Sequence, residues 1–154
     1  MCLSSCRRGA ETYLIAPSLK LVNSRHTSTR EDGLWRIFNW HGGDSTLPAI
    51  IEKDGIEALL SALPHVKDAS RVAILEMLLR MVPLDDGKAR MLKHDAAGRA
   101  AAACAKLERN PGLVGGSNSS DPAAAERCST LATALAQALH AAQPAASAES
   151  SSSS

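Results

Sequence analysis

The chain has 154 residues and a formal net charge of +1, so it has room for one domain with tails and is not an obvious binder of polyanions. Aromatic residues make up 3% of the chain and none follows Trp40, which argues against a stacking platform for single-stranded nucleic acid beyond that point. No run reaches the roughly 18 apolar residues of a membrane span. Any core beyond Trp40 must be built from Leu, Ile, Val, Met and Ala, which are mostly helix formers, and this predicts an all-α fold.

Residues 1–45 show no sustained apolar period. They carry five basic side chains before Glu31, against Glu11 as the only acidic residue before that point. We expect an irregular or disordered basic leader, or an artefact of the gene model. A basic, acid-poor segment that contains Ser and Thr is also typical of an organelle transit peptide, so this alternative stays open.

A block with helical periodicity spans residues 46–141 and is the expected ordered domain. Its first helix opens at Ser45 or Thr46, either of which can cap it. Asp54-Gly55 is expected to break or bend this helix, and Pro64 to end it, because glycine and proline interrupt helical patterns.

The second predicted helix follows Asp68 and has the widest apolar face of the block, so it should be the most buried element. Pro83 stops it. The next stretch, Leu84–His94, is highly charged, and we expect Asp85-Asp86-Gly87 to form a turn within it.

Two further helices complete the block. One runs from Ala96 to Glu108, and a neighbouring helix can approach it closely over a stripe of small residues. The other follows the cap Asp121-Pro122 and has the cleanest amphipathic pattern in the chain. The two stripes comprise Ala97, Ala101, Cys104 and Leu107 in the first of these helices, and Ala124, Cys128, Leu131, Leu135 and Leu139 in the second.

The predicted fold is therefore a compact four-helix or five-helix bundle between disordered N-terminal and C-terminal tails. Residues 142–154 are rich in Ala and Ser, bury too little apolar area to offset the entropy of ordering, and should be disordered. Cys104 and Cys128 lie on apolar helical stripes and are interpreted as small core residues, which favours a reducing compartment.

Signatures of catalysis are missing from the sequence. His41, His65 and His140 are scattered among different segments, and no CxxC pair or zinc spacing accompanies the cysteines. The Gly-Gly pairs lack the Lys-Ser/Thr of a phosphate-binding loop, and no Ser or Cys has a local nucleophile signature. We expect no enzymatic activity, no metal and no cofactor.

Five segments of the block succeed one another in a familiar order: Asp54–Leu60, Leu75–Leu84, Leu92–Ala100, Leu107–Asn110 and Cys128–Leu139. Together they resemble the TFIIS N-terminal domain family, which includes the similar domain of PNUTS. The resemblance covers about 90 residues and rests on helix order and a few anchor positions. It implies a helical bundle in a nuclear protein tied to RNA polymerase II elongation, which docks short, disordered acidic-hydrophobic motifs.

Charge in this part of the block suits such a partner. Between Lys67 and Arg109 there are nine Lys or Arg residues against six Asp or Glu. A basic rim beside an apolar groove steers acidic-hydrophobic peptides. The expected peptide-binding residues are Lys93, Arg99, Lys106 and Arg109. The alternative is that these side chains form a solvated helix face. We expect no direct nucleic-acid binding by the bundle and no membrane association, with the nucleus as the compartment and the cytoplasm as the alternative.

A second resemblance leads to a different architecture. The run Ile50–Leu60, followed by a Leu-rich helix, resembles one armadillo repeat. Repeat proteins need about three or more units to bury a continuous core, and the sequence suggests at most two imperfect ones. The alternative function is therefore a fragment of an armadillo-like or HEAT-like helical-repeat scaffold.

Overall fold

The computed structural model describes the backbone of residues 3–40, 43–109 and 122–141, and the side chains of residues 13–39, 43–105 and 122–141. This described part contains eight α-helices, two short 3-10 helices and no strand. The predicted all-α class is confirmed, whereas the predicted number of helices, four or five, is too low. The tail expected at residues 142–154 lies outside the described residues.

The first two helices correct the expectation of an irregular leader. Helix α1 spans Leu3–Val22 and helix α2 spans Thr27–Trp40. Buried apolar residues anchor both helices to the core; they are Ile15, Leu19 and Val22 in α1, and Leu34 and Ile37 in α2. The α1 residues have a helical i, i+4, i+7 spacing, but Pro17 and Lys20 interrupt the apolar run in the sequence and hide it. Pro17 removes one backbone hydrogen bond without ending the helix.

The next three helices are α3 (Leu47–Glu52), α4 (Gly55–Ala62) and α5 (Asp68–Met81). The predicted break at Asp54-Gly55 is confirmed. Asp54 has a left-handed conformation with φ of 59°, which turns the chain between α3 and α4. A Cβ on Gly55 would lie 2.3 Å from Cγ2 of Ile50, so only glycine allows this close approach.

The last three helices are α6 (Asp85–Lys93), α7 (Ala96–Arg109) and α8 (Pro122–Ala141). Helix α6 corrects the expectation of a turn at Asp85-Asp86-Gly87, because these residues form its first helical turn. Acidic residues in a first turn favour a helix through its dipole. Gly87 is required there by packing, since its Cβ would lie 2.4 Å from the Met81 carbonyl oxygen.

The predicted small-residue stripe of α7 is confirmed in part. Cys104 is buried and Ala97 packs against the core, whereas Ala101 is exposed and the side chain of Leu107 lies outside the described residues. The buried face also includes Ala96, Ala100 and Ala103. Cys104 and Cys128 are both buried as thiols, so their assignment as small core residues is confirmed. An alanine-rich helix gives little contrast between its faces, and a one-residue rotation is hard to exclude from sequence.

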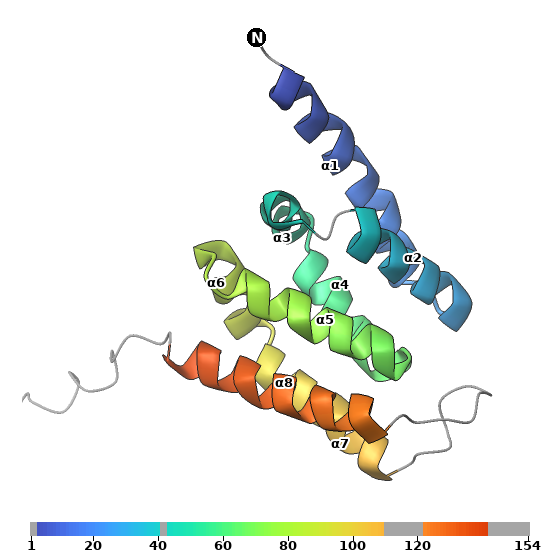
Figure 1. Cartoon of the computed structure of the whole chain (residues 1–154), viewed down its shortest axis with the longest axis vertical. Coiled ribbons are helices and arrows are strands. Elements are labelled where there is room, and N and C mark those ends of the chain that lie inside the picture. The colour runs from blue at the N-terminus through green and yellow to red at the C-terminus, as the bar shows by residue number, and fades with distance from the viewer. Residues whose placement is uncertain (1–2, 41–42, 110–121, 142–154) are drawn as a thin grey trace, which may run out of the picture.

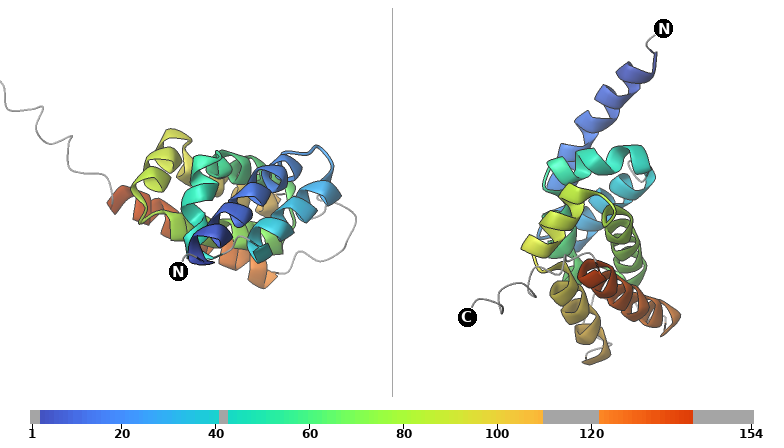
Figure 2. Two further views of the ribbon diagram at one scale, coloured as in Figure 1. Left: turned by 90° about the horizontal axis from the view of Figure 1, so that it is seen from above. Right: turned by 90° about the vertical axis from the view of Figure 1, so that its left-hand side faces the viewer.

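The eight helices stack in three layers, which we call the α1–α2, α3–α5 and α6–α8 layers (Figure 1). Equivalent helices lie on one another: α3 contacts α6, α4 contacts α7, and α5 contacts α8. In the same way α1 contacts α4 and α2 contacts α5. Helices α1 and α2 therefore correspond to the second and third helices of the other two layers, and within the described residues the α1–α2 layer has no counterpart of their first helix. The side view on the right of Figure 2 shows the same succession. The buried residues of all three layers form one hydrophobic core.

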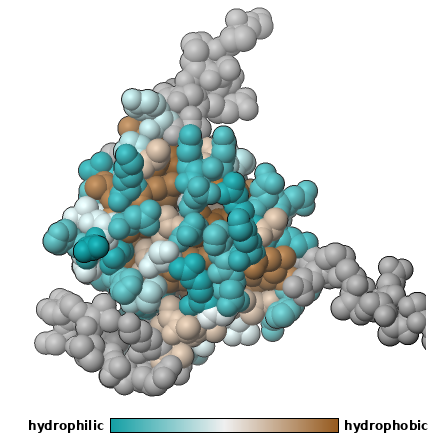
Figure 3. All heavy atoms as spheres, turned by 180° about the vertical axis from the view of Figure 1, so that it is seen from behind, coloured by the Kyte–Doolittle hydropathy of each residue, from teal (hydrophilic) through white to brown (hydrophobic). Residues whose placement is uncertain are grey.

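Polar contacts join adjacent layers at their edges. Between the first and second layers, Glu31 accepts a hydrogen bond of 2.8 Å from the backbone N–H of Lys67 and another from the Ser70 hydroxyl. Between the second and third layers, Arg127 forms an ion pair with Glu76. The face opposite to that of Figure 1 is mostly hydrophilic, with hydrophobic residues in small patches (Figure 3).

Candidate peptide-binding groove

The structure describes the side chains of two of the four predicted binding residues. Lys93 is exposed in the last turn of α6. Arg99 is half-buried in α7, and its Nη2 donates a hydrogen bond of 3.1 Å to the Ser61 hydroxyl of α4. The side chains of Lys106 and Arg109 lie outside the described residues. The predicted set is therefore split, with Lys93 at a helix end and Arg99 tied to the neighbouring layer.

A groove lies between α1 and the α3–α4 segment. It consists of two adjoining depressions of about 430 and 470 Å³, which share Ala16, Lys20 and Lys53. The first depression is otherwise lined by Tyr13 and Pro17. The second is otherwise lined by Leu19, Asn23, Asp54, Glu57, Ala58 and Ser61. Arg99 is not among the lining residues, but it donates a hydrogen bond to one of them, Ser61.

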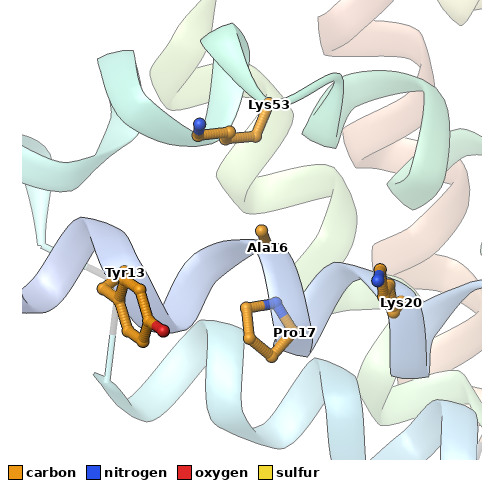
Figure 4. A pocket seen from close by; sticks show the side chains of 5 residues that line it. All are labelled: Tyr13, Ala16, Pro17, Lys20 and Lys53. Atoms are coloured by element: carbon orange, nitrogen blue, oxygen red, sulfur yellow. The ribbon is translucent and has the colours of Figure 1, made fainter.

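Two facing stripes at helical spacing build the walls of the groove. Ala16, Lys20 and Asn23 have i, i+4, i+7 spacing on α1, beside the stripe that anchors this helix in the core. Asp54, just before α4, and Ala58 and Ser61 within it have the same spacing. The alanines leave space between the two walls, since neither side chain extends beyond its Cβ. Figure 4 shows the first depression, with the labelled α1 residues in line along the helix and Lys53 across from them.

The electrostatics of the groove are biased towards positive charge. Lys20 and Lys53 are exposed, and neither forms an ion pair with another side chain that the structure describes. Asp54 in the second depression is neutralised by its ion pair with Arg90 of α6, which leaves Glu57 as the lining carboxylate without a described ion pair. The first depression has two lysines and no acidic residue in its lining. An anionic group should therefore favour the first depression over the second.

One backbone acceptor at the groove has lost its helical partner. In an α-helix the carbonyl of residue i accepts from the N–H of residue i+4. Pro17 has no N–H, so it cannot donate to the Tyr13 carbonyl, although both residues lie within α1. Tyr13 lines the first depression and its side chain is 80% exposed. The helix itself therefore leaves this carbonyl without its usual donor.

Sequence reasoning missed this groove because one of its walls lies in the supposed leader. The spacing of Ile15, Leu19 and Val22 was the available signal, since a buried stripe at helical spacing places Ala16 and Lys20 on the adjacent strip of the helix. The opposite wall depends on the joint at Asp54, which the sequence did indicate. The two walls lie side by side because α1 contacts α4. These helices are far apart in the chain, so the sequence does not indicate that they meet.

Within the residues that the structure describes, no three His, Cys, Asp or Glu side chains are grouped closely enough to hold a metal ion. The described helices include none that combines the length and the apolar character needed to cross a membrane. Comparisons of the chain with protein-family models, with curated proteins and with solved structures find no match. The resemblances to the TFIIS N-terminal domain and to the armadillo repeat both stay predictions.

Proposed function

We propose that the chain is a non-catalytic protein–protein interaction module that binds a disordered segment of another protein in the groove between α1 and α4. The observation that carries this proposal is the pair of facing helical stripes, which form an elongated groove with exposed cationic side chains on both walls. Such a groove offers an apolar floor for contact area and charges at the edge for steering, which is how short segments are commonly recognised.

The helical-repeat alternative receives more support than the closed bundle. Equivalent helices stack on one another in successive layers. Asp54 and Asp95 have left-handed φ values of 59° and 50° at corresponding joints of the second and third layers. Stacked units of this kind create extended binding surfaces between and along their layers. A place in transcription elongation and in the nucleus rests on the TFIIS resemblance alone.

A displayed library of disordered peptide segments tests this function directly. The library is selected against the wild-type protein, against Ala16→Trp, and against Ala89→Trp as a matched control. Ala16 is exposed in the groove, whereas Ala89 is exposed on α6, so each tryptophan can be added at the surface of a helix. Circular dichroism and the midpoint of thermal unfolding check that both variants fold.

The proposal predicts that the same peptides are enriched by the wild type and by Ala89→Trp, and that Ala16→Trp loses them. Affinity should lie in the range of about 1 to tens of micromolar, because a disordered segment must be ordered when it binds. Equal enrichment by Ala16→Trp would place the binding surface elsewhere. The absence of any enriched peptide from all three selections would contradict the proposed function itself.

A further inference from the structure

The first depression of the groove has features that define the chemistry of its occupant. Resting on the proposed function, we infer that this depression binds an acidic side chain next to an apolar one, within an extended segment of a partner protein. The carboxylate lies between Lys20 and Lys53, the apolar side chain packs on Tyr13 and Pro17, and a backbone N–H of the segment donates to the Tyr13 carbonyl.

The two lysines come from opposite walls. Lys20 belongs to α1 and Lys53 comes directly after α3, and both line the two depressions where these adjoin. A carboxylate held between two ammonium groups accepts charge-assisted hydrogen bonds, which are stronger than hydrogen bonds between neutral groups. The depression has no lining carboxylate to compete for the lysines. An acidic side chain therefore satisfies both walls at once, whereas a basic one is repelled by both.

The apolar contact depends on the other lining residues. Tyr13 is 80% exposed and Pro17 is exposed one turn further along α1, so a ring and a pyrrolidine face solvent beside the lysines. A Leu, Ile or Met side chain that covers them removes apolar area from water on both sides of the contact. The apolar residue of the partner should therefore be two positions from its acidic residue, because alternate side chains of an extended segment share one face.

The Tyr13 carbonyl favours an extended conformation of the segment. Because Pro17 cannot donate to this oxygen, a partner N–H can bond to it without displacing a helical hydrogen bond. A segment in a helix uses its own backbone donors internally, apart from its first turn, whereas an extended segment has donors free along its length. Glu57 in the second depression repels a further acidic side chain, so the carboxylate is expected in the first depression alone.

Fluorescence anisotropy with three labelled peptides of about ten residues tests the inference, since an extended chain of that size spans roughly 33 Å. Each peptide has Ser at every second position, and the positions between alternate Leu with Asp, Leu with Asn, or Leu with Lys, so that both side chains of a pair lie on one face of an extended chain. The Leu–Asp peptide should bind at least about tenfold more tightly than the Leu–Asn peptide, and its affinity should fall as salt is added. The Leu–Lys peptide should not bind.

Charge reversal in the protein supplies the specific control. The double variant Lys20→Glu/Lys53→Glu should lower the affinity for the Leu–Asp peptide by at least about tenfold, and it should bind the Leu–Lys peptide measurably. Lys88→Glu, a lysine of α6 outside the lining of both depressions, should leave both affinities within about twofold. Equal binding of the Leu–Asp and Leu–Asn peptides, or a loss with Lys88→Glu as large as with the double variant, would overturn the inference. If library peptides bind in the groove while the Leu–Asp peptide does not, the proposed function stands and the acidic chemistry is wrong.

Discussion

Asp54 and Asp95 hold the same position in two successive layers of the stack. Each has a left-handed backbone, with φ of 59° and 50°, and each joins a short helix to the next one. The backbone N–H of Asp54 donates to the Ile51 carbonyl at 3.2 Å, and that of Asp95 donates to the Leu92 carbonyl at 3.3 Å. The same joint is therefore built twice, at corresponding positions of the α3–α5 and α6–α8 layers.

This joint leads to a prediction about substitutions at Asp95. Asparagine tolerates a left-handed backbone, whereas alanine does not, and the Asp95 carboxylate also accepts a hydrogen bond from the Gly98 N–H at 3.3 Å. Asp95→Ala should lower the free energy of unfolding by about 1–3 kcal/mol, while Asp95→Asn should lower it by less than about 1 kcal/mol. Urea unfolding measures both, and equal losses would show that the left-handed conformation carries no strain.

A second prediction concerns the packing of α1 on α2. A Cβ on Gly33 would lie 2.7 Å from Cβ of Leu21 and 2.8 Å from the Ser18 carbonyl oxygen. Gly33→Ala should therefore destabilise the protein by about 1–3 kcal/mol, even though alanine is the better helix former. Gly43→Ala is the matched control, because its Cβ would meet only the Ser45 hydroxyl at 3.9 Å. If Gly33→Ala raises the unfolding midpoint instead, the two helices do not cross as described.

The sequence predicts several helix boundaries well because they depend on local chemistry. Helix α5 ends before Pro83 and α8 begins at Pro122, as the prolines indicate, whereas α5 begins at Asp68 itself and its N-cap is Lys67. The joint at Asp54-Gly55 was likewise visible as a break in an apolar pattern. These features need only a few neighbouring residues to act, so they can be recognised without the fold.

The α1–α2 layer and the groove could not be derived in the same way. Helix α1 shows little contrast between its faces in sequence, and its stability comes from contacts of Ile15 and Leu19 with distant helices. Helix α6 is short and highly charged, so its place depends on the close approach of Gly87 to Met81. Tertiary contacts of this kind override local propensity and have no signature in a single sequence.

Arg71 gives a third prediction, since it is a fully buried charge. Its side chain is 1% exposed, and it donates to the Leu63 carbonyl at 2.9 Å, to the Val66 carbonyl at 3.1 Å and to the Asp68 carboxylate at 3.0 Å. Arg71→Met should lower the free energy of unfolding by about 3–5 kcal/mol, because it leaves a carboxylate and two carbonyls without their donor.

Arg80 provides the control for this substitution. It also pairs with an aspartate, but its side chain is 41% exposed, and that of its partner Asp44 is 85% exposed. Arg80→Met should therefore cost less than about 1 kcal/mol. Urea unfolding of the two variants compares a buried and an exposed pair in one protein, and similar losses would contradict the burial of Arg71.

The fourth prediction is a loss of stability at alkaline pH that depends on Cys128. A hydrogen bond with Cys104, and then burial, raise the pKa of the Cys128 thiol above its ordinary value. The unfolded chain therefore loses this proton at lower pH than the folded protein does, so the stabilisation is complete below about pH 8.5 and declines as the pH rises further. For this one proton, the free energy of unfolding should fall by at most about 1.4 kcal/mol for each pH unit. Cys128→Ala should show a shallower decline in urea unfolding between about pH 8.5 and 10, and identical slopes would contradict the assignment.

The most direct measurement is amide chemical-shift mapping by NMR of the 16.1 kDa protein titrated with the Leu–Asp peptide. Binding in the groove predicts that the largest shifts fall on both walls, at Ala16 and Lys20 of α1 and at Lys53 and Glu57 beside and within α4. Shifts that instead gather around Lys93, with no change along α1, would contradict a binding groove between the first two layers.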